Sequence, residues 1–145
     1  MKRAGRKQPA AAPGAPPDLR ELSGFARRAR RRAFAPFSRF KVGAALRTRT
    51  GEVVTGCNIE NASYGLTLCA ERVAVFKAVS EGMRRFDAIA VVADSKRLTP
   101  PCGPCRQILW EFCGDIRVHM SDLRGRTRTM RLSELLPFPF DRSNL

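Results

Sequence analysis

The sequence lacks the features of a membrane or exported protein. No apolar stretch approaches the roughly 18 residues that a membrane-spanning helix needs. Residues 1–17 carry charges but no apolar core of the kind found in secretory signals, and they lack the serines and amphipathic pattern of an organelle-targeting peptide. We therefore expect a cytoplasmic protein with no membrane partner. In that compartment its five cysteines stay reduced, as metal ligands or buried thiols.

The chain is also poor in acidic residues. It has 13 Asp and Glu against 27 Lys and Arg, a formal net charge of +14. Four positive charges fall within residues 2–7, and arginine outnumbers lysine 22 to 5, as coding bias in a GC-rich genome would produce. We interpret the excess as a solvated basic surface that binds nucleic acid at most non-specifically and in a salt-sensitive way.

The length of 145 residues suits one folded domain. We expect residues 1–17 to be a disordered basic tail rich in Ala and Pro, and residues 18–145 to be the domain. Apolar periodicity and turn residues predict helices at 18–34, 68–81 and 103–112, a helical turn at 133–136, and strands at 41–49, 52–59, 86–93, 116–120 and 127–132. This order predicts an α/β fold in which a mixed sheet carries helices on both faces.

Three cysteines form the most informative pattern. Cys69 begins one predicted helix, and Cys102 and Cys105 form a C-x-x-C pair at the start of another. Three thiolates leave the fourth position of a tetrahedral zinc open for water, which is the arrangement of a catalytic site. Glu71 follows two residues after the first cysteine and can handle the protons of that water. The pattern therefore indicates a hydrolytic zinc enzyme.

The charge of such a site needs compensation. Three thiolates and one Zn²⁺ sum to −1, which weakens the metal as a Lewis acid. Arg72, beside Glu71, is the natural candidate to offset this charge from just outside the ligand set. The alternative is a structural four-cysteine zinc site that uses Cys57 as fourth ligand, although this leaves Glu71 without a purpose. We expect Cys57 and Cys113 to be ordinary buried thiols.

From about Phe34 onward the sequence resembles the small zinc-dependent cytidine deaminases that act on free nucleosides. Cys-Ala-Glu-Arg at 69–72 and Pro-Cys-Gly-Pro-Cys-Arg-Gln at 101–107 carry the resemblance, with further matching segments at 40–45, 56–62 and 76–82. The resemblance implies a three-layer α/β/α cytidine deaminase-like fold with a five-stranded mixed sheet. It also implies one Zn²⁺ per subunit and Glu71-dependent hydrolysis of cytidine and deoxycytidine to uridine and deoxyuridine plus ammonia.

The resemblance also implies how the substrate is bound. Asn58 and Glu60 match the ribose-binding motif, Phe40 matches an aromatic residue that packs on the pyrimidine, and Ala70 contributes backbone groups to the base. Tyr64 and Phe140 match residues that similar enzymes bring to the site of a neighbouring subunit. The family likeness thus predicts a homotetramer with shared active sites.

Three other functions remain open at this point. A relative acting on another aminopyrimidine nucleoside, such as blasticidin S, fits the Asn58–Glu60 motif less well. A polynucleotide deaminase is suggested by the net charge, but Glu60 would then lack the free 3′-hydroxyl that it is expected to bind. A basic RNA-binding protein without catalysis is hard to reconcile with an intact Glu71.

Overall fold

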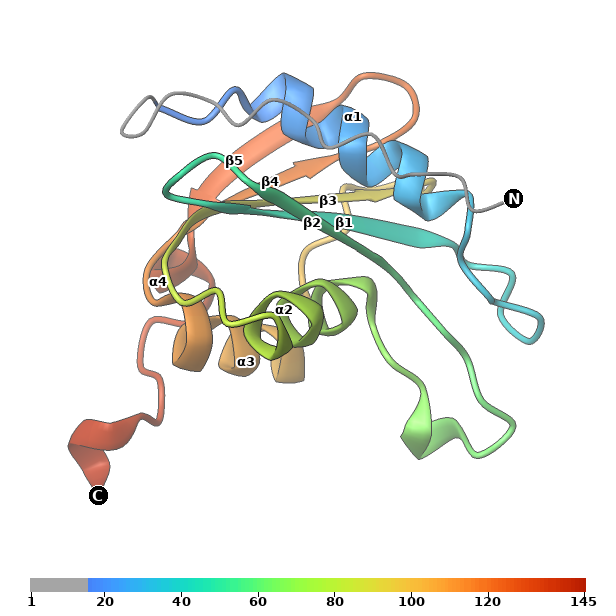
Figure 1. Cartoon of the computed structure of the whole chain (residues 1–145). Helices are drawn as coiled ribbons and strands as arrows, with labels where there is room; N and C mark the ends of the chain where they lie inside the picture. Colours follow the sequence, from blue (N-terminus) through green and yellow to red (C-terminus); the bar gives the residue numbers. More distant parts are fainter. Residues whose placement is uncertain (1–15) are drawn as a thin grey trace, which may run out of the picture.

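In the computed structural model, which describes residues 16–145, five strands form one mixed sheet (Figure 1). The strands are β1 (Val42–Thr48), β2 (Val53–Cys57), β3 (Phe86–Ala93), β4 (Arg117–Ser121) and β5 (Thr127–Arg131). They lie in the order β2-β1-β3-β4-β5, and β3 and β4 run parallel whereas the other neighbours are antiparallel. Nearly all of the expected tail, at residues 1–15, lies outside the described residues.

Helices cover both faces of this sheet. Helix α1 (Leu19–Arg30) lies on one face, and α2 (Ala70–Ser80), α3 (Gly103–Cys113) and the short α4 (Leu132–Leu135) lie on the other (Figure 1). The expected three-layer α/β/α architecture with a five-stranded mixed sheet is confirmed. Within residues 16–145, no helix has the length and apolarity needed to span a membrane.

The central strand β3 is buried on both faces, as its apolar run predicts. Ile89 and Val91 belong to the core beneath α2 and α3, whereas Ala88 and Ala90 belong to the core beneath α1. The small side chains on the α1 side let a single helix approach the sheet closely.

Two glycines mark the closest approaches between sheet and helices. A Cβ at Gly43 in β1 would lie 2.6 Å from the amide nitrogen of Arg30 and closer still to the Ala26 carbonyl oxygen, both in α1. A Cβ at Gly56 in β2 would lie 2.6 Å from the amide nitrogen of Ala74 and closer still to the Ala70 carbonyl oxygen, both in α2. The close contact at Gly56 therefore fixes the distance between the first turn of α2 and strand β2.

Helix α1 begins as expected but ends early. The Asp18 side chain accepts hydrogen bonds from the amides of Arg20 and Glu21, both at 3.0 Å. The helix stops at Arg30 rather than near residue 34, because Phe34 forms a parallel bridge with Ile59 instead. Two 3-10 turns, η1 (Tyr64–Leu66) and η2 (Arg142–Asn144), were not expected from the sequence pattern.

Candidate metal centre

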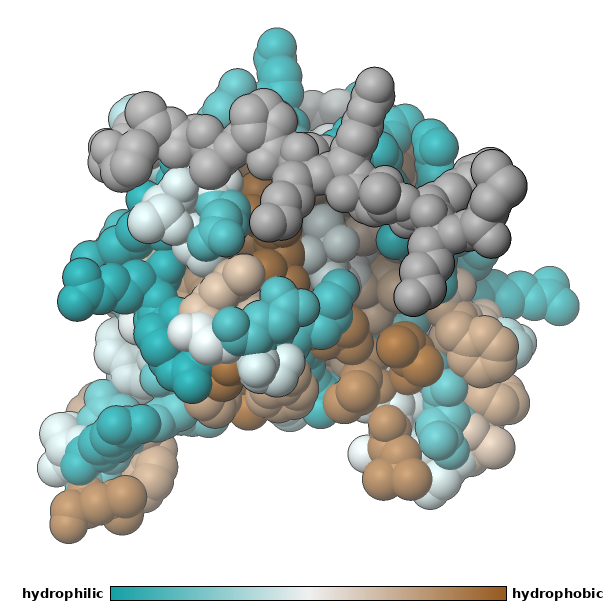
Figure 2. Space-filling view, viewed as in Figure 1, coloured by the Kyte–Doolittle hydropathy of each residue, from teal (hydrophilic) through white to brown (hydrophobic). Residues whose placement is uncertain are grey.

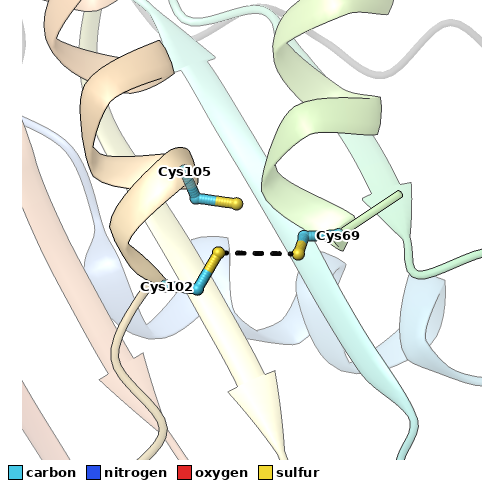
Figure 3. A group of neighbouring side chains, drawn as sticks. All are labelled: Cys69, Cys102 and Cys105. Carbon is cyan, nitrogen blue, oxygen red and sulfur yellow. Dashed lines mark hydrogen bonds between the residues drawn. The ribbon is translucent and has the colours of Figure 1, made fainter. Parts of the chain in front are cut away.

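The ends of α2 and α3 bring three cysteines together. The sulfur atoms of Cys69, Cys102 and Cys105 all lie within 4.8 Å of one another, and those of Cys69 and Cys102 are 3.7 Å apart. Their side chains point toward one another across the gap between the two helices (Figure 3). No other Cys, His, Asp or Glu of residues 16–145 joins this group, so Cys57 is not a fourth member.

Local sequence places the thiols at helix N-termini. Cys69 is the N-cap residue of α2 and Cys102 is that of α3, and both have extended backbone angles. Proline in the first turn of α3 stiffens the turn between Cys102 and Cys105. The positive ends of two helix dipoles therefore lie near the sulfur atoms, and they stabilise thiolates there.

The cluster has the geometry that zinc requires. Two sulfur atoms, each about 2.3 Å from a tetrahedral ion, lie roughly 3.8 Å apart, close to the 3.7 Å separation of Cys69 and Cys102. Cys105 is fully buried whereas Cys102 is exposed, so the group is open to solvent on one side. Three sulfur ligands with an open fourth position suit a catalytic zinc.

The thiols of the cluster also differ in pKa. A hydrogen bond from Cys105, assisted by the Arg72 guanidinium, lowers the pKa of Cys69 to about 5. The same hydrogen bond and burial raise the pKa of Cys105. Cys113 is separate from the group, and burial raises its pKa to about 12, which suits the expected inert thiol.

Glu71 lies in the first turn of α2, directly behind the cysteines. It is 4% exposed, and burial raises the pKa of its carboxyl to about 7. The charge of Cys69 raises this pKa further, whereas the Cys105 thiol interacts favourably with the carboxylate. The site therefore contains a carboxyl group that interacts with Cys69 and Cys105 and can both accept and donate a proton near neutral pH.

Arg72 reaches the sulfur cluster from the next position of α2. One guanidinium nitrogen donates to the Cys69 sulfur at 3.3 Å and to the carbonyl oxygen of Thr67 at 3.2 Å. A positive charge next to a thiolate offsets part of the negative charge that three sulfur ligands carry. The location agrees with the role expected for Arg72, which stays a prediction.

The two expected ribose ligands, Asn58 and Glu60, both hydrogen-bond to residues 37–42. Asn58 is buried just after β2, where its side chain accepts from the Val42 amide at 2.8 Å and donates to the Phe40 carbonyl at 2.7 Å. The Glu60 carboxylate accepts from the Phe37 amide at 2.8 Å and from the Ser38 amide and hydroxyl.

The hydrogen bond from Ser38 and those from the two amides hold the pKa of Glu60 below its usual value. The carboxylate is therefore ionised and fixed in place. Its two oxygens offer about four lone-pair positions to three donors, and the Ser38 amide is shared between both oxygens.

Backbone hydrogen bonds connect the segment that contains Asn58 and Glu60 to the metal centre. Ile59 bridges Leu68 with two hydrogen bonds of 2.9 Å, one residue before Cys69, and residues on both sides of Ile59 hydrogen-bond to Phe34. Sequence reasoning missed this pairing, because one-residue bridges have no periodic pattern. It also missed Ser38, which has no motif of its own and is recognisable only through its contact with Glu60.

The remaining expected binding residues differ in position. Ala70 is the buried first residue of α2, and Phe40, two residues before β1, is 39% exposed. Tyr64, 76% exposed, packs edge-on against Phe37 with ring centroids 6.0 Å apart. Phe140 lies on the C-terminal segment, where its carbonyl accepts a hydrogen bond of 2.7 Å from Gln107 of α3. The segments that carry Tyr64 and Phe140 extend from opposite sides of the fold (Figure 1).

Comparisons with known proteins agree with this geometry. Residues 18–120 match the family model for the cytidine and deoxycytidylate deaminase zinc-binding region. Cytidine deaminase from Halalkalibacterium halodurans is 58% identical over 113 residues, which cover 77% of this chain and 86% of that protein. Blasticidin-S deaminase from Bacillus cereus is 34% identical over 110 residues, covering 70% and 78%.

A solved structure gives the same result in three dimensions. The crystal structure of cytidine deaminase from Burkholderia pseudomallei superimposes with a TM-score of 0.81 at 46% identity, covering 83% of this chain and 98% of that one. The matched family model includes Cys69, Cys102 and Cys105, which the fold brings together with Glu71. The chain therefore belongs to the zinc-binding cytidine and deoxycytidylate deaminase family, as its sequence motifs predict.

Proposed function

We propose that this chain is a zinc-dependent hydrolase that deaminates free cytidine and deoxycytidine, as a step of pyrimidine salvage. Water adds to C4 of the cytosine ring, the bond between C4 and the exocyclic nitrogen breaks, and uridine or deoxyuridine and ammonia result. The observation that carries the proposal is the buried Glu71 carboxyl beside an open cluster of three thiols.

Glu71 moves the protons of this reaction. It accepts a proton from the attacking water, delivers one to N3 of the ring and assists the departure of the amino group. Burial matters here because a desolvated carboxyl changes its protonation state more readily near neutral pH than one in water. Its place in the first turn of α2, two residues after Cys69, keeps it close to that ligand.

Cys69, Cys102 and Cys105 hold the zinc, which when bound supplies Lewis-acid activation of water. The chain moderates the charge of this ligand set in two ways. The N-termini of α2 and α3, which carry the positive ends of the helix dipoles, lie next to the sulfur atoms. Arg72 donates a hydrogen bond to the Cys69 sulfur, which makes this thiolate a weaker electron donor to the metal.

Substrate selection rests on the residue 37–42 segment and its anchors. Glu60 is fixed by three hydrogen-bond donors and is the expected acceptor for a ribose hydroxyl. Asn58 holds the backbone of Phe40 and Val42, which sets the position of the Phe40 ring expected to pack on the pyrimidine. A 5′-phosphate would add negative charge near the Glu60 carboxylate, so a free nucleoside is favoured.

The active form is a homotetramer whose subunits complete one another's sites. Tyr64 and Phe140 are both exposed, as are Leu66 and Phe138 beside them. Figure 2 shows apolar side chains on both projecting segments, among polar ones, and further apolar surface between them. In a single chain Cys102 is exposed to solvent, so no protein wall covers this side of the cluster. Aromatic side chains from neighbouring subunits would supply that wall and exclude water.

A cytoplasmic location suits a site made of three reduced thiolates. The test is an absorbance assay of purified protein with cytidine, deoxycytidine, cytidine 5′-monophosphate and a short single-stranded oligonucleotide. We expect turnover of the two nucleosides and little with the other two substrates. Preferential turnover of the oligonucleotide, or none of either nucleoside, would overturn the proposal.

Glu71→Gln separates catalysis from metal binding. The amide is almost isosteric but cannot transfer the protons, so we expect full zinc content and a loss of turnover of at least about 10²-fold. Activity near that of the wild type would refute the role of Glu71. Sedimentation or light scattering of the wild type measures the mass, and a monomer that is fully active would refute the shared site.

A further inference from the structure

The face of the sheet opposite the metal centre carries a polar groove. Helix α1 packs on β1, β3 and β2 and contacts β4 much less, and most of β5 is exposed. A cavity of about 400 Å³ lies between the helix and these strands. Its volume falls in the range of small-molecule sites, roughly 300–1,000 Å³.

One stripe of α1 forms a wall of the groove. Arg20, Ser23, Gly24 and Arg27 line it, and their spacing of three and four residues puts them on one helix face. This face is cationic and lies beside the apolar face that packs on the sheet, and both arginines are exposed. The guanidinium groups of Arg20 and Arg27 have no hydrogen-bond or ion-pair partner among the described residues.

The opposite wall consists of hydrogen-bonding side chains from β4 and β5. His119 is 8% exposed, and its Nδ1 lies 2.7 Å from the Thr129 hydroxyl. Its Nε2 has no partner in residues 16–145 and is not enclosed, so it faces the groove. Ser121 lies 3.1 Å from Ser23, hydroxyl to hydroxyl, and links the two walls. In this pair one hydroxyl donates and the other accepts. The accepting hydroxyl keeps its own proton, which it can donate to a ligand.

The one carboxylate at the groove is already neutralised. Asp122 accepts from the side chain of Arg126 at 2.5 Å and from the amides of Arg124 and Arg126 at 2.8 and 2.9 Å. Within residues 16–145, Arg20 and Arg27 thus remain as the unpaired charges of the groove. Arginine binds phosphate oxygens in pairs of parallel hydrogen bonds, and hydroxyl and imidazole N–H groups complete such sites.

We propose that this groove binds the phosphate group of a small phosphorylated molecule. Arg20 and Arg27 bind the phosphate oxygens, and Ser23 or Ser121 and the His119 Nε2–H donate to them from the other wall. For this, Thr129 donates to Nδ1, which fixes the tautomer with the proton on Nε2. The groove lies on the other side of the sheet from the cysteines, so its ligand is distinct from the nucleoside substrate.

The test uses the only histidine of the chain as a probe. Protein without a histidine tag, loaded with zinc, is titrated with inorganic phosphate while NMR follows the imidazole signals. Sodium chloride at matched ionic strength is the reference. We expect a saturable shift of the His119 signals with phosphate and none of comparable size with chloride.

Two double variants test which charges matter. Arg20→Gln/Arg27→Gln should weaken phosphate binding at least about ten-fold, because charge-assisted hydrogen bonds are lost. Arg31→Gln/Arg32→Gln removes the same charge from the exposed end of the helix region and should weaken it less than about two-fold. Thermal unfolding and zinc content establish that both variants fold.

Three results would overturn the proposal. One is a shift that chloride reproduces. Another is equal weakening in both double variants, which would indicate general charge attraction. The third is a response to a single-stranded oligoribonucleotide but not to phosphate, which would indicate a surface for polyanions.

Discussion

Gly56 determines where the first metal ligand lies, and Gly56→Ala tests this. The glycine packs under the first turn of α2, which begins one residue after Cys69. The added Cβ would lie 2.6 Å from the Ala74 amide nitrogen, whereas ordinary van der Waals contacts begin at 3.4 Å. The nearer clash, with the Ala70 carbonyl oxygen, requires the helix backbone to retreat by about 1 Å, since both clashing partners are backbone atoms.

The size of the effect follows from this displacement. Overpacking of a tight core contact costs about 1–3 kcal/mol of unfolding free energy. A misplacement near 1 Å can lower turnover about 10²-fold when catalysis depends on fixed geometry. Cys69 and Glu71 both lie in the segment that moves, so zinc affinity and turnover should fall together.

Gly43→Ala is the matched control. It places a similar clash on the other face of the sheet, where α1 rather than α2 must move. Both variants should lose stability in urea unfolding. Gly43→Ala should keep the zinc content and turnover of each folded molecule, whereas Gly56→Ala should lose both.

Equal specific activity in the two variants would refute the reasoning, because the position of α2 would then not limit the site. So would a Gly56→Ala protein with normal zinc content and turnover. Zinc is measured by metal analysis of the folded fraction, and turnover by the absorbance change of cytidine.

Other predictions concern the metal, its charge and the fold. Removing zinc with a chelator should abolish deamination and lower the melting temperature, and added zinc should restore both, because the metal binds only the folded site. Arg72→Ala should lower zinc affinity or turnover about 10–100-fold by removing the donor to Cys69; unchanged zinc content and turnover would contradict its role. Asp18→Ala should cost about 1 kcal/mol in urea unfolding, whereas Asp18→Asn keeps a capping oxygen and should cost less.

Much of the fold follows from local sequence signals. The apolar run at 86–93 predicts the central strand with its observed bounds, and Asp18 predicts the start of α1. The end of α1 was less predictable, since Phe34 leaves the helix in order to pair with Ile59, a residue distant in sequence. A helix end that is set by a tertiary bridge leaves no signal in its own window of sequence.

The metal cluster was predictable for a different reason. Cysteine spacing and the adjacent Glu71 are dictated by chemistry, so the motif can be identified without coordinates. The contacts of Asn58 and Glu60 were not predictable in this way. Both were expected to face a sugar, whereas the contacts that the structure shows hold the backbone of residues 37–42.

By itself, the sequence determined the three-layer architecture, the three thiols and the carboxyl that serves them, because each depends on residue type and short spacing. Only the tertiary structure decided what each group touches. It placed the thiols at two helix ends, 3.7 Å apart for Cys69 and Cys102. It buried Glu71, which raises the pKa of this carboxyl, and it left an arginine-lined groove behind the sheet. Burial and contact arise where distant segments meet, and no local pattern encodes that meeting.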